Sequence, residues 1–178
     1  MTANGKQEQL RLGFLTAIEV PDKGFIGGLL VTNQCGRPLE FQCTVPVKAN
    51  ATQEILYGPT LAPFILGELI GGTLVEKAGV RPLWILTDCH EILELRNHVD
   101  RPVAVVEALA EDSAIGESDD CRKIRLGRQT IRFHPAHTDD HAAVSRDSRQ
   151  VPADADLQEP FERIREALQE TLKSGALR

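Results

Sequence analysis

In the segment WILTDCHEIL, residues 84–93, an apolar run is followed by the potentially reactive side chains Asp-Cys-His-Glu, which begin at Asp88. In open α/β sheets, ligands bind beyond the carboxyl ends of the strands, so an acid at such an end is a candidate metal ligand or acid–base catalyst. Asp is also a preferred helix N-cap, and Glu91 stands three residues later in capping-box position. We interpret Asp88 first as a helix cap, with metal binding or acid–base chemistry as the alternative.

The thiol of Cys89 is a second candidate in this run. A cysteine beside a helix N-terminus can have a lowered pKa and act as a nucleophile. A nucleophile needs a base that faces it, and neighbouring residues on a helix do not face each other. We therefore do not expect Cys89 and His90 to work as a catalytic pair.

Three further carboxylates are candidates for a site shared with Asp88. Glu54 stands near the start of a predicted helix, where it complements the helix dipole. Glu68 lies among apolar residues, and a carboxylate on an apolar face needs a partner. Glu19 is the only acid in the first predicted strand. For Glu54 and Glu68 we favour ordinary surface placement over catalysis.

A histidine cluster spans HPAHTDDH, with His134, His137 and His141 at spacings of three and four residues. His137 and His141 could share one helical face and bind zinc, with His134 or Asp140 completing the set of ligands. The alternative, which we favour, is a polar turn from strand to helix in which Thr138 caps and the aspartates meet the helix dipole.

One segment is locally basic, and alternating charges on a strand usually mark a solvated face. Such a row of cations could also bind the phosphates of a nucleic acid, although no aromatic residues are interleaved for base stacking. Nucleic-acid binding is thus a possible role that we do not favour. The cations are Arg122, Lys123, Arg125, Arg128 and Arg132.

The first half of the chain must supply strands to position these side chains. Residues 10–20 alternate, with Leu12, Phe14, Thr16, Ile18 and Val20 on one face, and turns separate them from predicted strands at 25–32 and 39–47. This pattern predicts an antiparallel meander. Two helical pieces follow at 52–58 and 60–78, the first with a capping box from Asn50 to Gln53.

The second half alternates buried strands with helices. Residues 80–86 and 102–109 are apolar on both faces, which is typical of buried parallel strands, and a short helix at 90–97 separates them. An acidic loop is predicted over 110–120, and the sequence of 123–133 predicts a hairpin or a bent strand. We expect one α/β domain over 1–144, a polar linker over 145–156 and an amphipathic helix over 157–178 that packs on the domain.

This order of elements resembles the ribonuclease H-like fold over residues 8–110. The sequence Leu86-Thr87-Asp88 before a helix is similar to the family's fourth-strand ending, where an aspartate binds metal. Thr52-Gln53-Glu54-Ile55-Leu56 resembles the family's first-helix segment with its metal-binding glutamate. The resemblance implies a mixed sheet of three antiparallel strands followed by helix-strand-helix-strand, with Asp88 and Glu54 as ligands of Mg²⁺ or Mn²⁺ and phosphodiester hydrolysis as the activity.

The first strand departs from the family pattern. The family's first aspartate lies inside that strand, and GFLTAIEV contains none. Glu19 or Glu68 would have to complete the ligand set, because two divalent cations need several converging carboxylates.

Composition narrows the class of protein. The chain has 178 residues, 42% of them apolar, and a formal net charge of −6 with a pI of about 5.4. The N-terminus has no apolar run after a basic start, and apolar stretches end well short of a membrane span. The four cysteines include no C-x-x-C pair. We expect a soluble cytoplasmic protein with free thiols, no membrane contact and a possible dimer through the C-terminal helix.

Three functions follow as hypotheses. The first is a small non-catalytic interaction or regulatory module that binds an unknown protein partner, because each candidate residue has a structural explanation. The alternative is an Mg²⁺- or Mn²⁺-dependent phosphodiesterase or nuclease of ribonuclease H-like type that uses Asp88, Glu54 and Glu19 or Glu68. The third is a zinc-binding domain at His134, His137 and His141.

Overall fold

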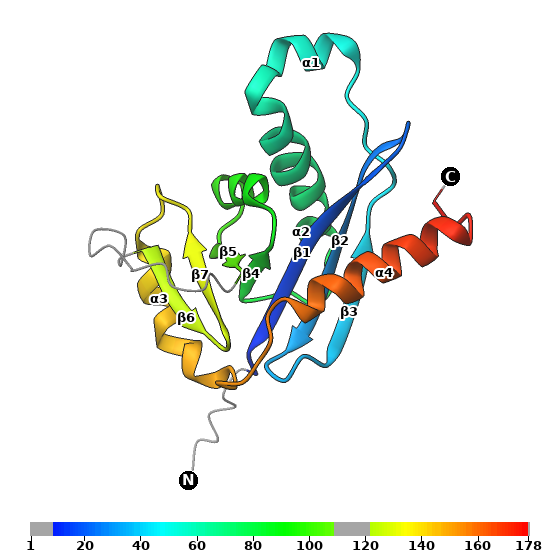
Figure 1. Ribbon diagram of the computed structural model, residues 1–178. Coiled ribbons are helices and arrows are strands. Elements are labelled where there is room, and N and C mark those ends of the chain that lie inside the picture. Colours follow the sequence, from blue (N-terminus) through cyan, green and yellow to red (C-terminus); the bar gives the residue numbers. More distant parts are fainter. Residues whose placement is uncertain (1–8, 109–121, 178) are drawn as a thin grey trace.

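The computed structural model describes residues 9–108 and 122–177 (Figure 1). The predicted acidic loop at 110–120 and the thiol of Cys121 lie outside the described residues. The described chain forms one seven-stranded mixed sheet with the strand order β3-β2-β1-β4-β5-β7-β6 and helices on both faces. The predicted α/β class is confirmed.

The predicted meander forms the first three strands, β1 (Arg11–Val20), β2 (Gly24–Asn33) and β3 (Pro38–Cys43). β1 pairs antiparallel with β2, and β2 pairs antiparallel with β3. The predicted third strand was too long, since β3 ends at Cys43. Beyond it, Val47 makes one isolated pairing with Phe25.

Two buried parallel strands lie next to the meander, as their apolar sequences predicted. β4 (Trp84–Thr87) pairs parallel with β1, and β5 (Val103–Glu107) pairs parallel with β4. β4 starts later than predicted because Pro82, which lacks an amide donor, precedes it. The order β3-β2-β1-β4-β5 with these directions is the sheet that the ribonuclease H resemblance implies.

The far edge of the sheet is the predicted hairpin. β6 (Lys123–Leu126) and β7 (Gln129–Phe133) pair antiparallel, and β7 continues the sheet beside β5. Gly127 makes the turn between them with a φ of 57°, a conformation that glycine adopts without strain.

The segment between β3 and β4 covers one face of the sheet. It comprises α1 (Ala51–Tyr57), the short 3₁₀ turn η1 (Gly58–Thr60), the π-helical segment η2 (Pro63–Gly71) and α2 (Gly72–Lys77). Together with the 3₁₀ segment η3 (His90–Asn97), it packs around Leu15, Leu29 and Ile85. The helix predicted over 60–78 is therefore present, as the π-helical segment η2 followed by the α-helix α2.

The opposite face is covered from the C-terminal part of the chain, by α3 (Asp139–Asp147) and α4 (Glu159–Lys173) (Figure 1). Phe161, Ile164 and Leu168 of α4 are buried, and Phe161 meets Phe14 of β1 edge to face at 5.6 Å. The predicted amphipathic helix is confirmed.

The segment predicted as a linker has structure of its own. α3 continues to Asp147, the turn η5 (Ser148–Gln150) follows, and Val151 is buried in the core. The mostly polar composition of residues 145–156 gave no sign that Val151 packs in the core. The division of the chain into domain, linker and helix stays a prediction.

Two glycines of β2 allow helices to approach from both sides. A Cβ on Gly27 would lie 2.1 Å from Ile70 of η2, and one on Gly28 would lie 2.6 Å from Ile164 of α4. Both distances are far below a normal contact, so this strand needs glycine for the two layers to pack.

In the described part of the chain, no single helix is long and apolar enough to span a membrane. The stretches Ala51–Thr60 and Pro63–Lys77 have the length and apolar composition of a membrane span only when they are taken together. They are bent by 99° relative to each other.

Candidate functional site

The carboxyl end of β4 lies beside the middle of β1, and this edge is where the fold would gather acids. Leu15 of β1 pairs with Thr87 of β4, so Thr16 and Asp88 are the next residues along each strand. Thr16 is 1% exposed and belongs to the face that α4 covers. The residue of β1 nearest this edge is thus a buried hydroxyl, where a shared metal site would need a carboxylate.

Asp88 is held by an arginine from the C-terminal helix. The guanidinium of Arg165 on α4 forms an ion pair with the Asp88 carboxylate, whose side chain is only 12% exposed. The other carboxylate oxygen, Oδ1, is buried and has no hydrogen-bond partner. A cation of the protein itself therefore neutralises the carboxylate that the sequence singled out.

The prediction that Asp88 caps the following helix is wrong. The N-cap position of η3 is Cys89, without a side-chain capping bond, and the Cys89 amide donates to Thr87 Oγ1 at 3.1 Å. The hydroxyl of Thr87 is close enough in sequence to serve that amide, which leaves Asp88 free to turn toward α4.

The thiol of Cys89 has low reactivity. Its thiol donates to Glu91 Oε2 at 3.0 Å. Burial, and then the hydrogen bond and negative charge of Glu91, raise the pKa of the Cys89 thiol to about 12. A thiol of this kind holds its proton at neutral pH, so it is a poor nucleophile and metal ligand.

The other predicted acids lie elsewhere. Glu19 and Glu54 line one groove, together with Asp22, between the tip of the β1–β2 hairpin and the start of η2. Glu68 faces His98, 3.8 Å away, and this histidine also lies 3.5 Å from Glu94. The structure therefore brings Glu19 and Glu54 together but does not add Asp88 or Glu68 to them.

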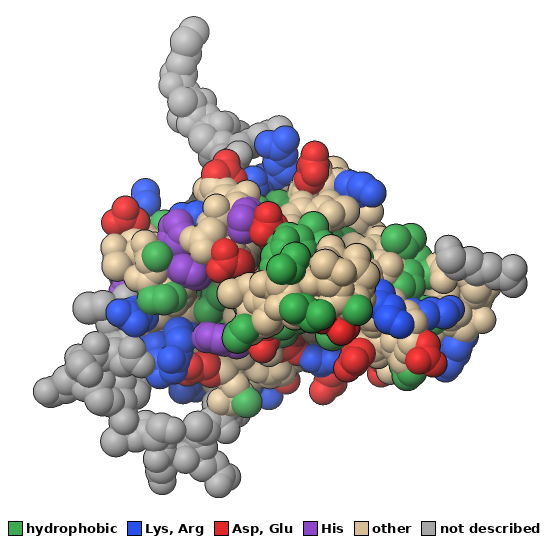
Figure 2. All heavy atoms as spheres, turned by 90° about the horizontal axis from the view of Figure 1, so that it is seen from above, with side chains coloured by type: hydrophobic (Ala, Val, Ile, Leu, Met, Phe, Trp, Pro, Cys, Tyr) green, Lys and Arg blue, Asp and Glu red, His purple; other side chains and the backbone are tan. Residues whose placement is uncertain are grey.

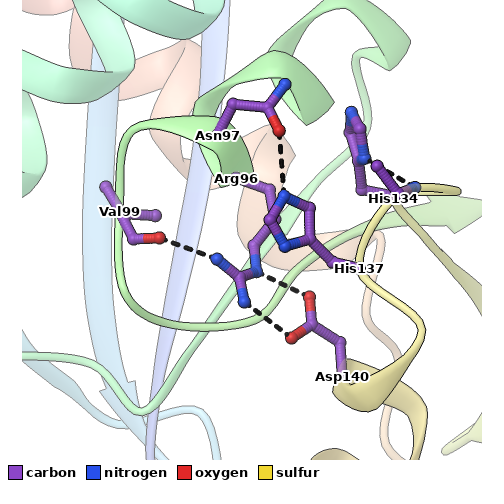
Figure 3. A network of polar contacts seen from close by, with 7 residues as sticks. Arg96, Asn97, Val99, His134, His137 and Asp140 are labelled. Atoms are coloured by element: carbon purple, nitrogen blue, oxygen red, sulfur yellow. Dashed lines mark hydrogen bonds and ion pairs between the residues drawn. The ribbon is translucent and has the colours of Figure 1, made fainter.

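Two of the three histidines of the predicted zinc site, His134 and His137, meet edge to face with their ring centroids 5.2 Å apart (Figure 3). His134 Nδ1 accepts from the Ala136 amide, and His137 Nε2 donates to Asn97 Oδ1 at 2.9 Å. His141 packs edge to face on Phe133. Burial, and then the neighbouring His137, lower the pKa of His134.

A buried ion pair that the sequence did not reveal lies beside these histidines. Arg96 of η3 binds Asp140 of α3 with two bonds of 2.7 and 3.1 Å, and its third nitrogen donates to the Val99 carbonyl (Figure 3). The Asp140 side chain is 5% exposed. We predicted Asp140 as a dipole partner or zinc ligand; its partner, 44 residues earlier in the chain, could be found only from the fold.

Thr138 occupies the predicted N-cap position of α3, but its side chain makes no capping hydrogen bond. The Arg96–Asp140 pair anchors the first turn of α3 in its place.

The basic segment is partly neutralised by the sheet itself. Lys123 and Arg132 both pair with Glu107 of β5, at 3.5 and 2.6 Å, and Arg125 donates to the Gly127 carbonyl. The nearest hollow, of about 480 Å³, mixes Arg122 and Arg132 with acids of η3 and with His90 and His134. Charges of both signs make a weaker phosphate site than the uniform row suggested by the sequence.

Metal-binding geometry is absent from the parts of the chain that are described. Across residues 9–108 and 122–177, no group of three or more His, Cys, Asp or Glu side chains is placed to hold a metal ion. The residues present therefore do not fit the two-cation centre that the ribonuclease H resemblance implies, nor a three-histidine zinc centre. Both remain predictions without a ligand cluster.

Comparison with known proteins finds similarity to solved structures only, at low sequence identity. No family model and no curated protein matches it. Among solved structures, it is similar to Ciona intestinalis endonuclease V in complex with an inosine-containing DNA, at 11% identity over 92% of this chain and 87% of that one, with a TM-score of 0.48.

Human endonuclease V gives a similar result, with 13% identity, coverage of 93% and 87%, and a TM-score of 0.45. Marinitoga piezophila Argonaute aligns with 72% of this chain and 23% of its own, with a TM-score of 0.34.

Proposed function

We propose that this chain is a non-hydrolytic interaction module built on a ribonuclease H-like sheet. The observation that supports this proposal most directly is the ion pair between Arg165 and Asp88. A divalent cation would have to compete with a guanidinium that is already in place, and a nearby positive charge raises the electrostatic cost of binding another.

The neighbouring residues support the same proposal. Thr16 offers no charge to a metal at this edge of the sheet. Glu19 and Glu54 share a different groove, and Glu68 faces His98. Phosphodiester hydrolysis in this fold depends on carboxylates that converge on two cations, and among the described residues no group of three or more His, Cys, Asp or Glu side chains is placed to hold a metal ion.

The test is a hydrolysis assay with single- and double-stranded DNA and RNA in Mg²⁺ or Mn²⁺. We expect no cleavage that depends on Asp88, so the wild type and Asp88→Asn should give the same background. Asp100→Asn, at an exposed aspartate, is the matched control. Cleavage that is lost in Asp88→Asn and kept in Asp100→Asn would overturn the proposal.

That outcome would establish the second candidate, a divalent-dependent nuclease that uses Asp88, Glu54 and Glu19 or Glu68. Asp88 stands at the carboxyl end of a parallel strand, where such a fold places catalytic acids. The similar structures named above are endonucleases, which agrees with this candidate more than with an interaction module. Elemental analysis for zinc after purification without chelator tests the third candidate, at His134, His137 and His141.

A further inference from the structure

The helix α1 stands out from the body of the molecule and buries none of its own residues (Figure 1). Ile55 is 81% exposed and Leu56 is 77% exposed, more than any other large apolar residue in the described chain. Figure 2 looks down on this side of the molecule, where hydrophobic side chains gather and charged ones surround them. Single exposed apolar residues are common on proteins, but two adjacent ones at this exposure on one short helix are not.

Local interactions hold α1 in shape without help from the core. Asn50 and Gln53 form a reciprocal capping box, with bonds of 2.8 and 3.0 Å. At the other end, Tyr57 stacks on Phe64 of η2 at a ring distance of 4.3 Å. An isolated helix of this length is marginal in water, so these contacts keep a preformed apolar surface in place.

The groove behind α1 is lined by exposed acids and by less exposed apolar residues. Its volume is about 230 Å³, and its charged residues are Glu19, Asp22, Glu54 and Lys48. Lys48 donates to the Asp22 carbonyl at 3.2 Å, and its single positive charge against three carboxylates leaves the lining net negative. The apolar part of the lining consists of Val20, Phe25, Val47, Leu61 and Ile65.

We propose that α1 and this groove dock a basic amphipathic segment of a partner protein. Apolar side chains of the segment pack on Ile55 and Leu56, and its lysines or arginines meet Glu54, Glu19 and Asp22. This is the mode in which an amphipathic helix lays its apolar face on a preformed hydrophobic surface. The inference rests on the proposed function and names the surface and the partner chemistry for it.

Charge separates this occupant from the others. A second copy that docked through the same surface would set Glu54 and its acidic neighbours against themselves, which costs energy in a symmetric interface. Anionic lipid and the phosphates of a nucleic acid would meet the same repulsion. A cationic apolar segment gains from both the charge and the exposed side chains.

The probe is a synthetic helical peptide with leucine on one face and lysine on the other. We expect it to bind the full chain and to shift the ring signals of Tyr57, the single tyrosine, in NMR spectra of tyrosine-labelled protein. The double variant Ile55→Ser with Leu56→Ser should bind at least about tenfold more weakly, since burying one such side chain is worth more than that factor.

Two controls separate docking from general attraction between opposite charges. Leu39→Ser removes an exposed leucine that lies beside Arg11 and Asn33, at the other end of the β1–β2 pair, and should bind the peptide as the wild type does. The same peptide with glutamate in place of lysine should not bind. Glu19→Gln with Glu54→Gln should weaken binding and reduce its dependence on salt.

Several outcomes would overturn this inference. These are an absence of peptide binding, equal binding by the Ile55→Ser, Leu56→Ser variant, self-association lost in that variant, or α1-dependent binding of anionic vesicles or oligonucleotides. The hydrolysis assay tests the proposed function independently of the peptide experiment. A chain that fails the peptide test but cleaves nothing loses only this docking surface, whereas Asp88-dependent cleavage removes the proposed function whatever the peptide does.

Discussion

The role of Asp88 depends on the residue opposite it, which no local pattern reveals. The sequence marks Asp88 as a helix cap or a metal ligand. In the structure it does not cap η3, and it pairs with Arg165 of a helix 77 residues later. A half-exposed guanidinium and a nearly buried carboxylate form a pair whose loss leaves an uncompensated buried charge.

We expect Arg165→Gln to lower the free energy of unfolding by about 2 kcal/mol, because Asp88 would then be buried without its cation. Asp88→Asn should cost less, since the freed Arg165 is partly exposed and can be hydrated. Urea denaturation of the two single variants and the double variant measures the coupling between them. A coupling energy of zero would contradict a stabilising contact between the two side chains.

The thiol of Cys89 gives a second test at the same scale. Its pKa of about 12 implies a thiolate fraction roughly a thousandfold below that of an ordinary cysteine at pH 8. Alkylation by iodoacetamide, followed by peptide mass spectrometry, should therefore label the exposed Cys35 long before Cys89. Unfolding in urea should remove the difference, and equal rates in the native protein would contradict the buried, Glu91-bonded thiol.

At the scale of elements, the pair Arg96–Asp140 fastens α3 to η3. Both side chains are mostly buried, and the bonds are bidentate, so removal of either leaves a charge without its partner. This contact fixes where the chain returns after β7, beside the three histidines that resembled a zinc site.

Asp140→Ala should destabilise the protein by about 3 kcal/mol, and hydrogen exchange in α3 should rise more than exchange in β1 or β4. Asp139→Ala, at the exposed neighbour in the same first turn, controls for the loss of an acid near the helix dipole and should cost under about 1 kcal/mol. Equal effects of the two substitutions would show that the buried pair does not anchor α3.

The elements themselves were largely predictable because their signals are local. Alternation along β1, the apolar runs of β4 and β5, the capping box at Asn50 and the apolar stripe of α4 each predicted the observed element. The site was not, since it depends on pairs such as Arg165–Asp88 and Arg96–Asp140 that join distant elements. A row of basic residues likewise gives no sign that Glu107, on another strand, forms ion pairs with two of them.

At the scale of the whole molecule, the sheet with strand order β3-β2-β1-β4-β5-β7-β6 positions two different surfaces. At the carboxyl end of β4, where such a sheet would place several acids, Asp88 forms an ion pair with Arg165. The helix α1, on another side, presents its apolar residues to solvent. The proposed interaction module rests on this arrangement, and the peptide experiment above examines the second surface.

Binding of Mn²⁺ tests the account most directly, because it reports on the closed site without any substrate. Titration of the full chain with Mn²⁺, with the free ion followed by electron paramagnetic resonance, should show no binding that Asp88→Asn removes. Arg165→Gln, which frees the carboxylate, shows whether the guanidinium alone blocks the ion. Stoichiometric binding to the wild type that disappears in Asp88→Asn would contradict the account.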